Sequence, residues 1–168
     1  YADSALRAMA YAEANYVASD YTEGPRLHRV ADERNLAALE LYRLTGERAW
    51  HDLFLSTTVF QSADADARAN SRHDQTEAAF LYAHLNDSLS SWRNDLSVDL
   101  PVQGSVQANA EAAFLRVGEQ QVTLTETTAF GWTKHRIYAA LGWRNGLGAP
   151  AAVNLLRAYT LSENEKYL

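Results

Sequence analysis

The sequence contains no cysteine. Disulfide bonds, thiolate metal sites and cysteine nucleophiles are therefore excluded. No apolar run approaches the roughly 20 residues that a membrane-spanning helix needs, so we expect no membrane segment. Basic residues are scattered along the chain and the formal net charge is -6. We therefore expect neither nucleic acid nor an anionic membrane surface as a partner.

The residues that are present fit a folded domain. A chain of 168 residues with 47% hydrophobic residues is typical of one globular domain, so we expect a folded chain and not an intrinsically disordered one. Four Trp, nine Tyr and five Phe supply large apolar side chains. Aromatic rings of this kind build a core, and they also stack on the apolar faces of sugars.

One stretch occurs twice. Residues 31–50 read ADERNLAALELYRLTGERAW, and residues 149–167 read APAAVNLLRAYTLSENEKY, with Tyr42 matching Tyr159 at a constant offset. Polar residues of the first copy follow one narrow stripe, and the remaining positions are apolar or small. A helix that is apolar over most of its circumference is covered on several sides. The repeat therefore predicts a helix, a turn and the start of a second helix inside a layered helical arrangement.

The turn of the repeat carries its own signal. Gly46 follows the first helix, where glycine is the usual residue just past a helix C-terminus, and Glu47 opens the next helix. The second copy has Glu163 where the first has Gly46, which makes its turn signal weaker. Asp32 is the expected N-cap of the first repeat helix.

The rest of the chain also favours helices. The stretch from Val122 to Thr127 alternates like a short strand, but it has no partner strand in the sequence and is expected to be an extended loop. We expect no sheet, and an all-α fold of six or seven helices arranged as a toroid or barrel of paired helices. The helices are expected at about residues 3–18, 31–45, 47–59, 73–85 and 102–118, followed by the second repeat helix.

These motifs carry a resemblance. ADERNLAALELYRLTGERAW resembles the Asp-Glu-x-x-Trp-Ala-Ala-x-x-Leu-Tyr-x-x-Thr-Gly-(Asp/Glu)-x-x-Tyr hairpin of glycoside hydrolase family 9. Gly142-Trp143-Arg144-Asn145 and the hairpin after it are similar to that family's Trp-Gly-Ser-Asn segment and its following hairpin. Leu36 stands where the family usually has Trp. The sharp motifs cover about a quarter of the chain, and a looser likeness covers most of it.

The resemblance implies a fold and an activity. It implies that residues 1–168 are one internal, incomplete piece of an (α/α)6 catalytic barrel, whose partner is the remainder of the parent domain. It also implies an extracellular or periplasmic glycoside hydrolase acting on β-glycosidic bonds of cellulose, β-glucan or a related sugar. Inverting hydrolysis needs one carboxylic acid and one carboxylate base. The family's catalytic Asp and Glu would lie outside these residues, so no catalytic residue is expected within them.

Two groups of residues are candidates for substrate binding. Trp143 and Asn145, and also Trp132, combine an aromatic face with hydrogen-bonding groups, which is the chemistry that a sugar ring requires. His73 and Asp74 lie near the position of a family motif that reaches the substrate cleft. Asp74 also suits a structural role as a carboxylate at a helix N-terminus.

No metal or cofactor is expected. His73, Glu77 and His84 would share one stripe of a helix, but their spacing departs from the HExxH zinc pattern and favours a polar stripe. In calcium-binding relatives the acidic pair would match Asp32 and Glu33. The positions before this pair hold His28 and Arg29, and the charge of Arg29 would occupy the place of a cation.

Two other interpretations stay open. The chain fits another (α/α) toroid, such as a sugar epimerase or an uronyl hydrolase. It also fits a non-catalytic scaffold of helical hairpins that binds carbohydrate or protein. Tryptophan quenching by a soluble oligosaccharide separates the carbohydrate-binding interpretations from a scaffold for protein partners.

Overall fold

The computed structural model describes residues 1–15, 21–23, 26–28, 30–69, 73–86, 100–127 and 150–168. This part of the chain is mainly α-helical, which confirms the all-α class. None of its helices is long and apolar enough to cross a membrane. The helices are α1 (Ala2–Asn15), α2 (Val30–Thr45), α3 (Arg48–Thr57), α4 (Thr76–Ala83), α5 (Gly104–Thr127) and α7 (Pro150–Ser162), with 3₁₀ turns η1 (Val59–Gln61) and η4 (Glu165–Tyr167).

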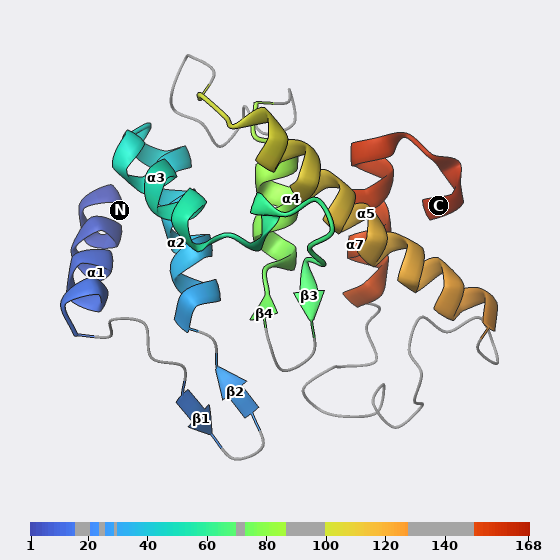
Figure 1. Ribbon diagram of the computed structural model, residues 1–168, viewed down its shortest axis with the longest axis horizontal. Coiled ribbons are helices and arrows are strands. Elements are labelled where there is room, and N and C mark those ends of the chain that lie inside the picture. The colour runs from blue at the N-terminus through green and yellow to red at the C-terminus, as the bar shows by residue number, and fades with distance from the viewer. Residues whose placement is uncertain (16–20, 24–25, 29, 70–72, 87–99, 128–149) are drawn as a thin grey trace.

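Three of the helices form a central row. In Figure 1, α2, α4 and α7 stand side by side and run in the same direction, with α4 in the middle. Helix α3 packs along α2, and α5 packs across both α4 and α7. Helix α1 lies on the outer side of α2 (Figure 1). Helix α2 therefore contacts α1, α3 and α4, as its nearly all-round apolar sequence predicts.

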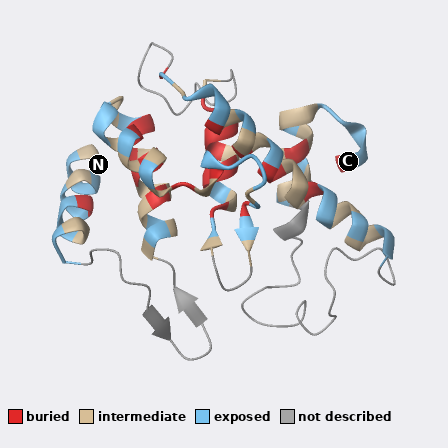
Figure 2. Cartoon of the chain, viewed as in Figure 1, coloured by how far each residue is buried: buried red, intermediate tan, exposed pale blue. Residues whose placement is uncertain are grey.

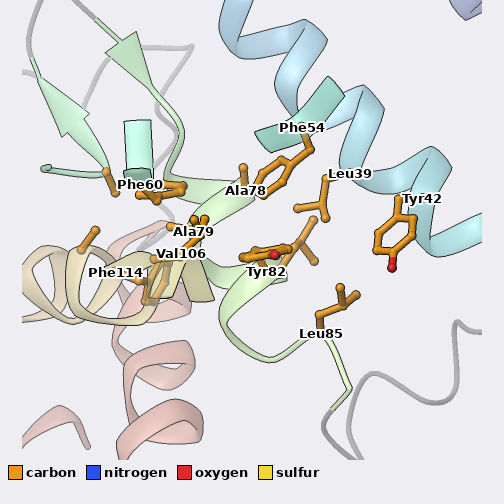
Figure 3. Packing of buried hydrophobic residues seen from close by; sticks show 14 of the residues in the cluster. Leu39, Tyr42, Phe54, Phe60, Ala78, Ala79, Tyr82, Leu85, Val106 and Phe114 are labelled. Atoms are coloured by element: carbon orange, nitrogen blue, oxygen red, sulfur yellow. The ribbon is translucent and has the colours of Figure 1, made fainter. Parts of the chain in front are cut away.

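The core lies between the central row and the helices that cover it. Figure 2 shows the buried residues concentrated in α2, α3, α4 and the first half of α5. Figure 3 shows how the aromatic side chains of this cluster pack together, with Phe54 beside Tyr82 at 4.6 Å between ring centroids. Complete burial of a side chain such as Phe54 contributes about 1.5–3 kcal/mol to folding.

The two copies of the repeat form the same turn. Among the described residues, Gly46 is the glycine and Glu163 the non-glycine residue with positive φ, at 71° and 53°. The Gly46 N–H donates to the Tyr42 carbonyl at 2.8 Å, and the Glu163 N–H donates to the Tyr159 carbonyl at 2.7 Å. The glycine turn is therefore confirmed, and the second copy makes the same turn with a glutamate.

The hydroxyl residue before each turn also has the same role in both copies. Thr45 Oγ1 donates to the Leu41 carbonyl at 2.9 Å, and Ser162 Oγ donates to the Ala158 carbonyl at 2.8 Å. Each hydroxyl oxygen then accepts a hydrogen bond from a backbone N–H two residues later. The repeat seen in the sequence is therefore a repeat of hydrogen bonding as well.

Several boundaries differ from the expected ones. Helix α1 is described to Asn15, and residues 16–18 lie outside the described part. Helix α3 ends at Thr57 and is followed by η1, whose Phe60 N–H donates to Thr58 Oγ1. Helix α5 continues to Thr127, so the prediction of an extended loop from Val122 was wrong. The residues from Val122 continue α5 because Val122 packs against the core cluster, which overrides the β-like alternation.

Small antiparallel hairpins are present where no sheet was expected. β1 (Tyr21–Glu23) pairs with β2 (Arg26–His28), and β3 (Arg68–Ala69) pairs with β4 (His73–Asp74). Strands of two or three residues have too few side chains to show an alternating pattern. The prediction that a helix begins at His73 was therefore wrong, because β4 comes first and α4 begins at Thr76.

One expectation for α2 was also wrong. The helix begins at Val30, so Asp32 lies within its first turn and is not its N-cap. Arg43 belongs to the polar stripe of this helix, and only 3% of it is exposed. Its Nη1 donates to Glu40 Oε2 at 2.9 Å.

Candidate functional site

The candidate site lies at one end of the central row. The N-terminal ends of α2, α4 and α7 point the same way, and both hairpins lie at that end (Figure 1). Hairpin β1–β2 comes just before α2 in the chain, and hairpin β3–β4 comes just before α4. We call this end the N-terminal rim, comprising the two hairpins and the first turns of the three helices.

Asp74 connects three parts of the N-terminal rim. Its Oδ1 accepts hydrogen bonds from Thr76 N at 3.3 Å and Thr76 Oγ1 at 2.8 Å, at the beginning of α4. Its own N–H donates to Asp32 Oδ2 at 2.8 Å, and its Oδ2 lies 3.3 Å from Arg68 Nε. The structural role expected for Asp74 at a helix N-terminus is therefore confirmed. Its substrate-binding role stays a prediction.

His73 is fixed by the loop that precedes β3. Its Nε2 lies 2.6 Å from the carbonyl oxygen of Asp66. A carbonyl only accepts hydrogen bonds, so Nε2 carries the proton, and in the neutral ring Nδ1 is then an acceptor. Half-buried and oriented in this way, His73 has an acceptor suited to a hydroxyl group.

Gln75 is a buried polar residue that joins three helices, and sequence reasoning missed it. Its Nε2 donates to Asp32 Oδ1 at 2.8 Å and to the Thr57 carbonyl at 3.2 Å. Its Oε1 accepts from Val59 N at 3.1 Å and from Thr58 Oγ1 at 3.3 Å. Because each polar atom of this buried amide has partners, Gln75 holds the beginnings of α2 and α4 against the end of α3.

An ion pair connects α4 to α7. The Arg157 guanidinium donates two hydrogen bonds to the Glu77 carboxylate, at 2.6 and 2.8 Å. Its Cζ also lies 4.6 Å from the centroid of the Phe80 ring. Two parallel hydrogen bonds and an aromatic face restrict the guanidinium to one orientation. The spacing between α4 and α7 is therefore fixed near the rim.

The expected polar stripe of His73, Glu77 and His84 is not formed. His73 lies on β4, Glu77 pairs with Arg157, and buried His84 hydrogen-bonds the Phe80 carbonyl through Nδ1. The three share no helix face because α4 begins after His73. Within the described ranges, no group of three His, Cys, Asp or Glu side chains is arranged to hold a metal ion.

The aromatic candidates occupy the segment that leads into α7. Trp132, Trp143 and Asn145 lie outside the described residues. In the chain they come shortly before Pro150, the first residue of α7. Their roles in substrate binding stay predictions.

A second polar cluster lies inside the core, away from the rim. The His51 ring stacks on Tyr42 with centroids 4.6 Å apart, and its Nε2 lies 2.8 Å from Tyr82 Oη. The same Tyr82 hydroxyl accepts a hydrogen bond from the Gln103 N–H at 2.8 Å. Burial lowers the pKa of His51, with a smaller opposing effect from Asp52 and a small lowering effect from Arg48. Burial raises the pKa of Tyr82.

A hollow of about 630 Å³ lies between α1 and α2. None of the rim residues described above lines this hollow. Its lining is mostly alanine and other apolar side chains, with Glu40 and Arg43 as the polar members. Its apolar chemistry does not match that of a sugar, and we assign the candidate site to the rim.

Among the described side chains of the N-terminal rim, His73 Nδ1 and the exposed carboxylate of Asp74 are hydrogen-bond acceptors. We assign no proton-transfer role to the described carboxylates of the rim, because Asp32 and Asp74 are both used in holding the hairpin β3–β4 against the helices. The chain matches no protein-family model, no curated protein and no solved structure.

Proposed function

We propose that this chain is part of a glycoside hydrolase similar to family 9, acting on β-glycosidic bonds of a glucan or related sugar. The catalytic Asp and Glu of the inverting mechanism would lie in other parts of the parent domain. In an (α/α)6 barrel, α2, α4 and α7 would be three of the inner helices. Such an enzyme would act outside the cell or in the periplasm.

The observation that carries the proposal is the common direction of the central row. Three helices begin at one end, and each follows a segment with polar or aromatic side chains. Those segments are the two hairpins and the stretch that contains Trp132 and Trp143. A sugar ring bound across such a rim would meet acceptors from hairpin β3–β4 and aromatic faces from the segment before α7.

Each candidate residue has a distinct part in this proposal. Trp132 and Trp143 would stack on sugar rings, and Asn145 would hydrogen-bond to their hydroxyls. His73 would accept a hydroxyl hydrogen bond at Nδ1. Asp74 would accept one at its exposed carboxylate while it keeps α4 in place. The chain alone would therefore bind an oligosaccharide without cleaving it.

Two-dimensional NMR of the indole N–H groups tests the binding. The chain has four tryptophans, so each indole reports separately on titration with cellohexaose. We expect the signals of Trp132 and Trp143 to shift, and the signal of Trp50 to stay in place because it packs against the core in α3. Trp143→Phe assigns one signal and should weaken binding.

Other outcomes favour the alternatives. If millimolar cellohexaose moves no indole signal, the carbohydrate proposal is wrong and a scaffold for protein partners replaces it. A response to uronic-acid oligosaccharides alone favours another sugar-processing toroid. For the parent enzyme, NMR of the newly released reducing end should show the α-anomer first, because inversion of a β-linkage gives that product.

A further inference from the structure

We propose that the hollow between α1 and α2 is a binding site for an aliphatic carboxylate of medium chain length, with Arg43 holding its carboxylate. The hollow has a volume of about 630 Å³, which lies within the roughly 300–1,000 Å³ that is typical of small-molecule sites. The proposal does not depend on sugar hydrolysis, because the rim residues do not line this hollow.

Small side chains form the α1 wall of the hollow. The lining residues of α1 recur at helical spacing, and three of the four are alanines, Ala5, Ala8 and Ala12. Met9 is the fourth, and it is the buried residue of this helix. An alanine side chain ends at Cβ, so these positions leave space between the two helices. The stretch from Ala5 to Ala12 is about 10 Å long, which suits an extended aliphatic chain.

The two helices are tied together at one end of the hollow. Arg34 of α2 donates two hydrogen bonds to the Glu13 carboxylate of α1, at 2.5 and 2.6 Å. The helices run in opposite directions (Figure 1), so the other end of the hollow lies between the beginning of α1 and the end of α2. Leu44 and Ala5 are both exposed there. An aliphatic chain therefore enters from that end.

Arg43 supplies a polar contact near the open end. Its side chain lines the hollow, although only 3% of the residue is exposed. Its Nη1 donates to Glu40, but its Nε has no hydrogen-bond partner among the described residues. A buried donor without an acceptor is unfavourable, so a ligand that brings an acceptor to this side chain gains affinity. The apolar walls and the arginine together favour a ligand with an aliphatic body and an acidic head.

The edge of the guanidinium that Glu40 does not use has the geometry that a carboxylate recognises. Arg34 holds the Glu13 carboxylate through its Nε and Nη2 atoms, and the same two atoms of Arg43 lie away from Nη1. A carboxylate on this edge would accept two parallel, charge-assisted hydrogen bonds. Nε is shielded from water, so we expect the guanidinium to turn toward the hollow on binding. Glu40 is 45% exposed, and water therefore screens its charge from the ligand.

Titration of the full chain with octanoate tests the proposal. The chain has one methionine, and Met9 lines the hollow, so its methyl group gives a single reporter signal in NMR. We expect octanoate to shift this signal until it saturates. Methyl octanoate has the same chain but no charge, and it should bind about tenfold more weakly because it cannot form the charge-assisted pair.

Three variants locate the ligand. Arg43→Lys keeps the positive charge but removes the Nε–Nη2 edge, so it should weaken octanoate binding about tenfold and leave methyl octanoate binding unchanged. Ala8→Leu fills the hollow and should weaken the binding of both compounds. Its matched control, Ala10→Leu, changes an exposed alanine of α1 that does not line the hollow, and it should bind octanoate as the parent chain does. Circular dichroism checks that each variant is folded.

Three results would overturn the proposal. The first is a Met9 signal that stays in place at millimolar octanoate. The second is an equal affinity for octanoate and its methyl ester, or an unchanged octanoate affinity in Arg43→Lys, because Arg43 would then not hold the carboxylate. The third is octanoate binding that survives Ala8→Leu, since the ligand would then lie outside the hollow. If Arg43→Lys does not fold, the ester and the alanine variants still decide.

Discussion

Substitution of Glu163 by glycine tests whether the turn of the second repeat copy has a strained backbone. Glu163 has a φ of 53°, at the position where the first copy has Gly46. A residue with a Cβ atom in the left-handed region loses about 1–2 kcal/mol relative to the right-handed helix, and glycine avoids this loss. Glycine also lowers the free energy of unfolding by about 0.5–1 kcal/mol, because its backbone has more conformational freedom in the unfolded state. Glu163→Gly should therefore raise the free energy of unfolding by about 0.5–1 kcal/mol.

Two further variants separate the backbone effect from the loss of charge. Glu163→Ala removes the carboxylate and keeps the Cβ atom, so its free energy of unfolding should stay within about 0.5 kcal/mol of the parent value. Gly46→Ala makes the reciprocal change and should lower the free energy of unfolding by about 1 kcal/mol.

Urea unfolding of the three variants provides the measurement. With a slope of about 2–3 kcal/mol per molar urea, the expected gain for Glu163→Gly moves the midpoint up by about 0.3 M. The comparison that decides is Glu163→Gly against Glu163→Ala. If glycine gives a midpoint equal to or below that of alanine, position 163 has no left-handed strain in solution and the reasoning fails.

Three other perturbations have definite expected outcomes. Gly118→Ala places a Cβ atom 2.9 Å from the Ala158 Cβ, so it should lower the free energy of unfolding by about 1–3 kcal/mol, which a lower melting temperature reports. The control Gly104→Ala places its Cβ atom with nothing within 4 Å, so it should be neutral or stabilising. Gln75→Ala leaves buried groups without hydrogen-bond partners and should lower the free energy of unfolding, measured with urea, by about 2–3 kcal/mol. A decrease no larger than that of Gln120→Ala, at an exposed position, would contradict the connecting role of Gln75. The pKa of His51 is lower in the folded state than its ordinary value of 6.5, so the unfolded state takes up the proton first as the pH falls. The free energy of unfolding should therefore decrease as the pH falls from about 7 until the folded pKa is reached. His51→Gln should show a shallower dependence of the free energy of unfolding on pH. A steeper dependence in the variant would contradict a buried neutral ring.

Much of the central row was predictable from the sequence. The repeat is visible because the two copies match at a constant offset, and Gly46 marks the end of α2 by its freedom to adopt positive φ. The Glu163 turn has no such marker. The structure forms it because the flanking hydrogen bonds to Tyr159 and Ala158 determine the backbone path.

The polar connections of the core were not predictable. A single glutamine has no sequence signature, so Gln75 is recognised only when α2, α3 and α4 have been brought together. His51 falls on the expected second helix, but its partner Tyr82 is 31 positions away. Of the predicted substrate-binding residues, His73 and Asp74 do reach the rim, while the fold around Trp132 and its neighbours is not described.

The contacts of α7 have a consequence for the order of folding. Helix α3 joins α2 through the hydrogen bond from Asn35 to Phe54, which spans 19 positions, whereas Arg157 reaches Glu77 across 80 positions. Closing the longer loop costs about 1.2 kcal/mol more entropy, since each doubling of loop length adds about 0.6 kcal/mol. We therefore expect the pair α2 and α3 to assemble first, and α7 to join α4 and α5 later, after the rate-limiting barrier. Weakening the α7 contacts would then accelerate unfolding and leave the folding rate almost unchanged.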